Sequence, residues 1–374
     1  MPTFQEYKDA MLDPTRHQIF KIEWMDKDEN IIDEVITDLL DGSVSIQMQN
    51  GVRRSCNINF ENNDGRFTPS NNGLVWISKK FKLYSGLVID GEDVFPPESV
   101  QGVFNLGNPI VRSTGSTSIV SIEGYDNFSL LNGTLAGQLD TSVSTIEKGT
   151  LITDAVSLTL ADAGIVQTPL IYSSDEQVPT NLVQEAGSTY GDVLIELANI
   201  LAWQIYFNQH GRPVFKPTPD ETLIDRIWDF NDEEVSYMGC DHNFNYADVR
   251  NNIVVYGDNI DGALAVGTAE DNGVFSPTSI SRIGKRTKSI TDNMIKDSTL
   301  AQNRANYELR NSIQAYEYVD LRCINLDFLE ANDVVSLRDT NGALDDDRYL
   351  IKQINRNLNF NSTMTVKAWK VREI

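Results

Sequence analysis

Apolar and polar residues alternate with a period of two along much of the chain, which is the pattern of half-buried β-strands. Strands are predicted at residues 17–26, 31–36, 43–49, 53–62, 81–89, 99–112 and 118–126. A run dense in turn formers, from Glu61 to Gly73, predicts an ordered loop or a surface excursion. Short strands at this spacing predict an antiparallel barrel or sandwich.

The alternation stops around Phe128 to Leu135, and a helical period follows. A helix is predicted over residues 149–163, with Thr150 as its cap and Gly164 as its terminator. The face that we expect it to bury consists of Ile152, Ala155, Val156 and Thr159.

A second helix and a hairpin occupy residues 188–217 and form the clearest unit in the sequence. Ser188 or Thr189 caps the helix, and Asp192 suits its positive end. At Trp203 the period changes to two, and a turn at 209–212 returns the chain to a strand that Pro217 ends. We expect the unit to be scaffold, with its helix packed on its own hairpin through Leu194, Leu197, Ala198 and Leu201.

The last third returns to alternation around one more helix. Strands are predicted at residues 227–230, 235–244, 249–258, 319–327, 333–339, 348–358 and 362–371. The helix, residues 296–315, has Ser298 or Thr299 as its cap and pairs Arg304 with Glu308 on its outer side. Its buried stripe is predicted to be Ala301, Ala305, Leu309 and Ile313. The last four strands, with an acidic turn at 345–347, predict a closed or nearly closed meander.

The predicted fold class is therefore mixed and mainly β. Two antiparallel barrel-like β domains, residues 1–135 and 236–374, flank a smaller α+β middle domain, residues 136–235. The second β domain carries the helix at 296–315 ahead of its last four strands.

Composition narrows the class of protein. The chain has 374 residues, of which 40% are hydrophobic and 23% charged, as in ordinary globular proteins. No apolar run approaches the ~20 residues of a membrane span, and the N-terminus lacks the order of a signal peptide. Cys56, Cys240 and Cys323 are far apart in sequence, so we expect no disulfides and synthesis in a reducing compartment.

The net charge of −23 is the outlying number. Contacts to phosphate come from clustered Lys and Arg, so this charge argues against a nucleic-acid reader and against docking on anionic membranes. Two interpretations stay open: a charge that serves solubility, or a surface that must not adhere to a polyanion passing close by.

Motifs for catalysis or metal binding are weak throughout. Residues 26–30 copy the opening of a calcium loop, but Ile31 replaces the required glycine and Thr37 the required carboxylate, so a hairpin turn is predicted. His17 and His242 are expected to be satisfied on strands and His210 to lie in a surface turn. Cys240 shares a strand face with His242, but nothing else indicates a thiolate pocket. We predict no catalytic, cofactor-binding or metal-binding residues, and no cofactor.

The order of the segments resembles that of phage tail hub proteins, which include baseplate hubs and the hub regions of tail-associated lysins. In the first half of the chain the resemblance rests on three features: a strand followed by an Asn-Asp-Gly loop that ends at Thr-Pro, a strand that contains Gly-Val-Phe, and a strand whose end is rich in Tyr and Asp. In the second half it rests on the mid-chain helix and hairpin and on the last helix with the strands that follow it. These are residues 53–70, 100–111, 121–131, 191–215, 300–315 and 329–371. Lysin-type members continue into a peptidase or glycosidase domain, whereas this chain stops at Ile374, so the resemblance implies the hub alone.

This resemblance implies a structural, non-enzymatic function. Such hubs are homotrimers in which two barrel-like domains per subunit give a pseudo-hexameric ring that closes the tail tube, so the regions before about Val120 and after about Val235 should superimpose. The implied partners are a distal tail or tail tube protein, a tape measure protein, and receptor-binding or lysin components. DNA would pass through an acidic channel without sequence-specific binding, and no stable membrane association is implied. The implied location is the virion tail tip or baseplate, after assembly in the host cytoplasm.

Two other functions stay open. A carbohydrate-binding or receptor-binding tail protein would need aromatic platforms on loops, and Trp76 is the one candidate among the five tryptophans. A cell-wall hydrolase is the third interpretation, and no constellation of residues supports it.

Overall fold

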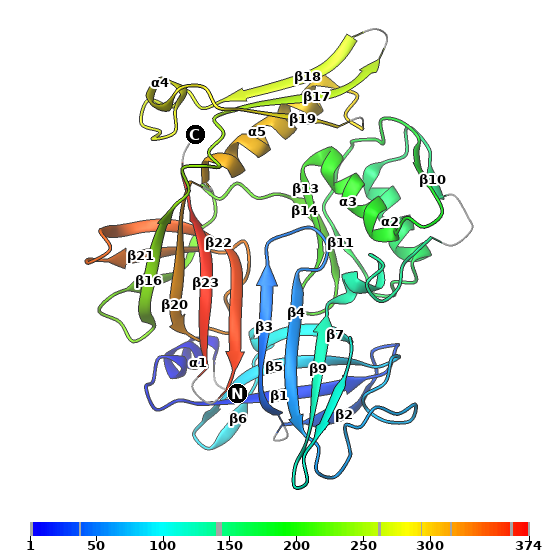
Figure 1. The fold of residues 1–374 in the computed structure, drawn as a ribbon, viewed down its shortest axis with the longest axis vertical. Coiled ribbons are helices and arrows are strands. Elements are labelled where there is room, and N and C mark those ends of the chain that lie inside the picture. The colour runs from blue at the N-terminus through cyan, green and yellow to red at the C-terminus, as the bar shows by residue number, and fades with distance from the viewer. Residues whose placement is uncertain are drawn as a thin grey trace.

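The computed structural model describes residues 3–36, 39–139, 144–260, 263–292, 294–314, 316–359 and 362–372 (Figure 1). We call the part up to Tyr125 the N-terminal β region. Its elements are α1 (Phe4–Met11), β1 (His17–Met25), β2 (Ile31–Val35), β3 (Leu39–Gln47), β4 (Arg54–Glu61), β5 (Lys80–Ile89), β6 (Glu92–Val94), β7 (Val100–Leu106), β8 (Ile110–Ser113) and β9 (Ser118–Tyr125).

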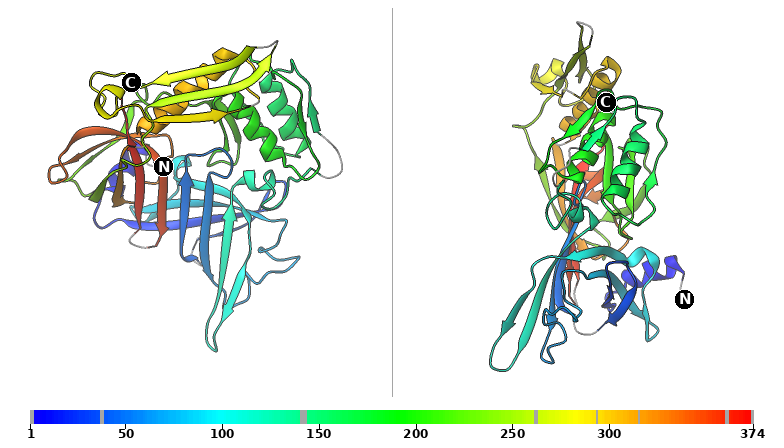
Figure 2. Two further views of the ribbon diagram at one scale, coloured as in Figure 1. Left: turned by 45° about the horizontal axis from the view of Figure 1, so that its top comes forward. Right: turned by 90° about the vertical axis from the view of Figure 1, so that its right-hand side faces the viewer.

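The middle region follows a short 3-10 turn, η2 (Asn127–Leu130). Its two helices lie to one side of the molecule (Figures 1 and 2). The elements are β10 (Ser144–Ile146), α2 (Ile152–Asp162), β11 (Leu170–Ile171), β12 (Leu182–Gln184), α3 (Tyr190–Leu201), β13 (Trp203–Phe207) and β14 (Pro213–Pro217).

The rest of the chain forms two parts. The C-terminal β region consists of β15 (Arg226–Asn231), β16 (Tyr237–Phe244), β20 (Glu317–Ile324), β21 (Val334–Asp339), β22 (Leu344–Leu358) and β23 (Thr363–Lys370). Between β16 and β20 the chain builds a separate layer, in which a small sheet packs on a long helix (Figure 2). This layer contains β17 (Asn252–Ile260), β18 (Ala263–Glu270), α4 (Ile280–Ile283), β19 (Thr287–Thr291) and α5 (Ser298–Gln314).

One sheet joins the two β regions. Its strand order is β16-β20-β23-β22-β3-β4-β9-β7-β5-β1-β2, and the join is the antiparallel pair of β22 with β3. Six residues of each strand pair there, from Gln353 with Gln47 to Leu358 with Gly42. The prediction of a mainly β fold is confirmed, and the hydrogen-bonded order of the described strands is open at both ends.

The pairs β21–β22 and β22–β23 of the predicted meander are confirmed, but its first strand does not lie beside its second. β20 pairs with β23, and β21 pairs with β22 and, in parallel, with β15. The acidic turn predicted at 345–347 is also wrong, because these residues begin β22 and the turn lies at residues 340–343. This part of β22 pairs with β21 beyond the end of β3. Its carboxylates therefore stay in solvent, and the alternation of apolar and polar residues that predicts a strand is missing there.

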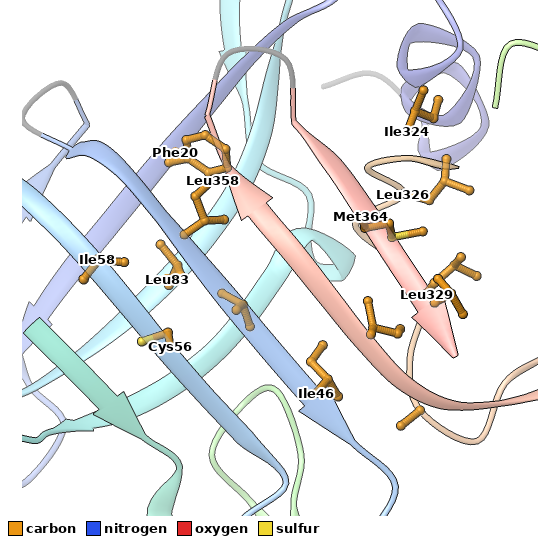
Figure 3. Packing of buried hydrophobic residues seen from close by; sticks show 14 of the residues in the cluster. Phe20, Ile46, Cys56, Ile58, Leu83, Ile324, Leu326, Leu329, Leu358 and Met364 are labelled. Atoms are coloured by element: carbon orange, nitrogen blue, oxygen red, sulfur yellow. The ribbon is translucent and has the colours of Figure 1, made fainter. Parts of the chain in front are cut away.

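The core beneath the sheet is shared by both β regions. Val44, Ile46 and Ile58 from the first region are fully buried in the same cluster as Ile354 and Met364 from the second. Figure 3 shows these strands side by side, with Leu358 of β22 next to Phe20 of β1. Burying aliphatic side chains of this size contributes roughly 1.5–3 kcal/mol each, so the join is a hydrophobic contact as well as a ladder of hydrogen bonds.

The predicted helix and hairpin of the middle region are confirmed with one correction. Thr189 caps α3 in a reciprocal pair with Asp192, and Leu194 and Leu197 pack on the hairpin in a second core. Leu201 is only partly buried, because Ile200 takes the inward position in the last turn. This second core also includes side chains of β17, β18 and α5.

The caps of the other two predicted helices lie elsewhere. α2 buries the predicted face but begins after Leu151, which makes no side-chain cap, so Thr150 is not the cap. α5 buries all four predicted stripe residues, and Asp297 caps it by accepting from the backbone N–H groups of Thr299 and Leu300 at 2.6 and 3.2 Å.

The predicted Arg304–Glu308 pair forms at 3.0 Å but is not on an exposed face. The two side chains are 18% and 14% exposed. Arg304 also donates to Asn199 of α3, and Glu308 accepts from Lys288 of β19. The pair therefore belongs to a network that ties α5 to the middle region.

The sequence did not predict several of the observed elements. These are α1, α4, β6, β10, β11, β12, β18 and β19. The largest of the missed helices is α1, whose start is a capping box between Thr3 and Glu6. It buries Tyr7 and Met11, and the Tyr7 hydroxyl donates to Asp327 at 2.9 Å, which fastens the start of the chain to its C-terminal β region.

Candidate assembly face and polar junction

The joined sheet presents one continuous polar face to solvent, and we call it the assembly face. In Figure 1 its strands β20, β23, β22, β3, β4 and β9 run side by side. Side chains alternate along each strand, so Ile354 and Val366 are buried on one side while Asn355 and Thr365 are exposed on the other.

Register aligns neutral polar side chains in rows across this face. One row runs from Thr365 through Asn355 and Ser45 to Ser55. The next row contains Asn357, Ser43 and Asn57. Most assembly-face positions on the four central strands are amides and hydroxyls, and the exceptions are Asp41, Glu61 and Lys367 near the strand ends. The uncharged positions are Ser43, Ser45, Gln47, Ser55, Asn57, Asn59, Gln353, Asn355, Asn357, Thr363 and Thr365.

Charged groups lie towards the ends and flanks of the assembly face. The carboxylates in this position are Asp41, Glu61, Glu123, Asp241 and Asp320, and the cations are Arg112, Arg322 and Lys367. Carboxylates therefore outnumber cations only slightly here, although the chain carries 54 acidic and 31 basic residues. Most of the net negative charge lies on other surfaces.

A buried polar junction lies behind the join. Arg54 of β4 donates to the Gln101 carbonyl at 3.1 Å and forms an ion pair with Glu330. Arg356 of β22 donates to the side-chain oxygen of Gln101 at 2.5 Å and to the Leu329 carbonyl. Both arginines are almost completely buried, so Gln101 links the two β regions through two guanidinium groups.

The same junction reaches the middle region. The Arg53 guanidinium stacks on the Tyr206 ring at 3.4 Å, and burial lowers its pKa to about 10. Gln204 of β13 exchanges hydrogen bonds with Asn332, the shorter at 2.8 Å. The two β regions and the middle region thus meet in one set of buried polar contacts.

Two carboxylates in the junction have raised pKa values. Asp126 accepts from the backbone N–H groups of Arg53 and Arg54 at 2.7 and 2.9 Å, yet burial raises its pKa to about 6. Burial also raises the pKa of Asp333 to about 7, and Glu330 nearby adds to the rise. Both shifts follow from the loss of water around a charged group.

Cys240 and His242, which were considered for chemistry, each contact an acidic side chain. Cys240 and His242 share a face of β16 as predicted, but His242 binds Glu317 at 2.9 Å and Cys240 lies 3.6 Å from Asp339. Burial raises the pKa of the Cys240 thiol, which disfavours a thiolate.

The remaining motif residues are structural. Asp26 accepts from the backbone N–H groups of Asp28 and Asn30 at 2.9 Å, so the predicted hairpin turn is confirmed. His17 begins β1, and His210 lies exposed in the turn between β13 and β14, as predicted. Thr37, part of the calcium-loop comparison, lies outside the described residues.

The described ranges contain neither a metal-binding cluster nor a membrane-spanning helix. Within them, no three or more His, Cys, Asp or Glu side chains are grouped to hold a metal ion. Among the helices in the described part of the chain, none combines the length and apolar character of a membrane span.

The arginines of the junction were missed by sequence reasoning, although a signal exists. Arg54 lies two residues before Cys56, and Arg356 two residues after Ile354, so both have the parity of core residues on their strands. An arginine at a core position of a strand predicts a buried, hydrogen-bonded guanidinium.

Comparison with solved structures places this architecture among tail proteins. No protein-family model and no curated protein matches the chain. A tail protein from Neisseria meningitidis MC58 aligns over 94% of this chain and 96% of its own, with a TM-score of 0.65 and 11% identity. The 43 kDa tail protein of prophage MuSo2 from Shewanella oneidensis covers 94% of this chain and 98% of its own, with a TM-score of 0.62 and 12% identity.

A third structure is related to secretion. The E. coli c3393 protein is described as a component of the type VI secretion system, with structural similarity to the T4 tail proteins gp27 and gp5. It aligns over 90% of this chain and 74% of its own, with a TM-score of 0.55 and 10% identity. This chain therefore has the fold of phage tail proteins, and the predicted resemblance is confirmed at the level of the fold.

Proposed function

We propose that the protein is a structural, non-enzymatic hub at the tip or baseplate of a phage tail. Three copies form a ring in which the two predicted β domains, residues 1–135 and 236–374, act as equivalent modules. Six modules around a channel match the sixfold symmetry of a tail tube while keeping threefold symmetry below it. The fold shared with tail proteins supports the location, and the joined sheet supports the ring.

The observation that carries the proposal is the assembly face. It spans both β regions without a break, and its centre is dominated by amides and hydroxyls at Asn355, Ser45 and Asn57. Such a surface lacks the clustered cations that hold phosphates, so DNA would pass it without adhering. The slight excess of carboxylates at its flanks would add repulsion, as an acidic channel would.

In this function the ring closes the tail tube and anchors other tail components. Its neighbours would be a distal tail or tail tube protein, a tape measure protein, and receptor-binding or lysin proteins. The protein would assemble in the host cytoplasm, use no cofactor, bind neither membranes nor DNA sequences stably, and reach the virion as part of the tail.

Immunogold electron microscopy of particles that contain the chain tests the proposed location. Antibodies against the purified protein should label the distal end of the tail, and label along the tube or on the head would contradict the proposal. Zymography on cell-wall material tests the absence of enzymatic activity, because clearing by the purified chain would show a hydrolase.

A second candidate function rests on Trp76. This side chain is 38% exposed, and with Ile77 and Pro109 it lines a cavity of about 400 Å³. An aromatic ring beside an open cavity is typical of sugar binding. If the protein binds a carbohydrate receptor, Trp76→Ala should abolish the signal on a glycan array, whereas a wild-type protein without signal excludes this function.

A further inference from the structure

One apolar side chain is displayed on the surface without any contact that explains it. Phe275 is 93% exposed and its neighbour Val274 is 76% exposed. Both lie at the tip of the loop between β18 and α4. A fully solvated phenylalanine gives the folded chain no burial energy, and next to Val274 it offers an apolar tip that another surface can cover.

The loop that carries Phe275 is held in one conformation from below. Asp271 is completely buried and accepts from Ser276 Oγ at 2.6 Å, Thr278 Oγ1 at 2.7 Å and the Gly273 N–H at 3.1 Å. Hydrogen bonds of this kind remove much of the entropy that a free loop would lose on binding. The tip is therefore a pre-organised anchor.

Basic residues surround this anchor in a chain that is otherwise strongly acidic. Residues 273–291 contain no Asp or Glu, while Arg282, Lys285, Arg286 and Lys288 are all exposed. Lys285 and Lys288 pair with Glu270 and Glu308, whereas Arg282 and Arg286 donate to the backbone carbonyls of Val274 and Tyr246. We call Phe275 and these four cations the basic anchor.

The outer face of α2 carries carboxylates around an exposed apolar side chain, which makes it complementary to the basic anchor. Leu158 is 60% exposed between Asp154 and Asp162, which lie one turn before and after it. Val166, 73% exposed, follows shortly after the helix. Between residues 144 and 200 eight carboxylates stand against Lys148 alone: Glu147, Asp154, Asp162, Asp175, Glu176, Glu185, Asp192 and Glu196.

The two surfaces lie on opposite flanks of the molecule. In Figure 1 α4 is at the upper left and α2 at the right, and Figure 2 keeps them on opposite sides. A patch and its complement on opposite flanks cannot meet within one chain, but they can meet between two copies. A contact of this heterologous type closes into a ring when the rotation between copies permits it.

We propose that the basic anchor of one copy docks on the outer face of α2 in the next copy. Phe275 would pack against Leu158 and Val166, and Arg282 and Arg286 would face Asp154 and Asp162. The charges would steer and orient the contact, and the apolar groups would hold it. The inference rests on the proposed ring and names the contact that joins its subunits.

Cysteine cross-linking between two populations tests this contact directly. Full-length Phe275→Cys and Leu158→Cys proteins, both with Cys240→Ser to remove the accessible natural thiol, are mixed at high concentration and oxidised. We expect a mixed disulfide dimer in high yield. The matched control is Leu223→Cys in place of Leu158→Cys, since Leu223 is 82% exposed and lies outside both surfaces.

A charge swap provides a second test of the proposed contact. Reversal of Arg282 and Arg286 to Glu should lower the cross-linking yield about tenfold or more, and so should reversal of Asp154 and Asp162 to Lys. Mixing the two reversed proteins should restore it. Yields that equal the Leu223→Cys control, or no rescue by the swap, would overturn the inference.

The double variant Phe275→Cys/Leu158→Cys separates this inference from the proposed ring. Covalent products that stop at three copies support both. A ladder that continues beyond three supports the contact and contradicts the ring, whereas trimers by mass without any cross-link support the ring and contradict the contact.

Discussion

Three buried arginines determine how the parts of this molecule meet. Arg54 and Arg356 share Gln101, and Arg53 stacks on Tyr206 of the middle region. A buried guanidinium loses its hydration, so each one requires a fixed set of acceptors. The acceptors come from different regions of the chain, which makes the junction a device for relative placement as well as a source of stability.

The junction also makes stability depend on pH through Asp333. Its pKa in the folded chain is about 7, above the unfolded value near 3.8, so the folded state holds the proton more tightly. The contribution of Asp333 to folding stability is therefore fully present below about pH 4 and is lost as the pH rises through 7. Asp333→Asn removes the charge and keeps an oxygen that can accept from the Glu330 N–H.

We expect Asp333→Asn to be more stable than the parent at about pH 8, by roughly 1–3 kcal/mol, and equal to it near pH 4. Urea unfolding across this pH range measures the difference. The matched control is the exposed Asp93, for which Asp93→Asn should leave the profile unchanged. A gain that persists at pH 4, or a loss at pH 8, would contradict the explanation.

At the scale of elements, local chemistry predicts most of the fold. The stripe of Ala301, Ala305, Leu309 and Ile313 is buried as expected, because helical periodicity reports which face packs. The position of β20 beside β23 could not be derived, since strand pairing depends on contacts distant in sequence. Caps were misplaced by one or two residues because Asp297, Ser298 and Thr299 all favour a helix start.

The last turn of α3 gives an element-scale prediction. Leu197 is completely buried in the second core, whereas Leu201 is only partly buried. Leu197→Ala should lower the free energy of unfolding by about 2–5 kcal/mol, and Leu201→Ala should lower it clearly less. Urea unfolding measures both changes from the shift in the midpoint, provided that the dependence of the free energy on urea concentration is unchanged. Equal losses for the two variants would contradict the assignment of the buried face of α3.

At the scale of the whole molecule, continuity is the main feature. The sequence predicts two β domains, and the structure joins their strands through β22 and β3 over a shared core. Alternation alone cannot show this, because an edge strand and a paired strand have the same pattern of side chains. The assembly face exists only because of the join.

Because of the join, we expect the backbone amides of the two β regions to lose their protection against hydrogen exchange together. Ile354 is fully buried at the join, so Ile354→Ala should destabilise both sides of it by about 2–5 kcal/mol. Hydrogen exchange followed by mass spectrometry should show faster exchange in peptides from β4 and β9 as well as from β20 and β23. Faster exchange confined to β20 and β23 would mean independent domains, and the exposed Val111→Ala serves as control.

A density map of the assembled particle tests the central claim, that three copies surround a channel with the assembly face inward. The map should contain a threefold ring at the tail tip, with the rows through Asn355, Ser45 and Ser55 lining its bore. A ring of another copy number, or a ring in which these rows face outward or lie buried against a neighbour, would contradict the account.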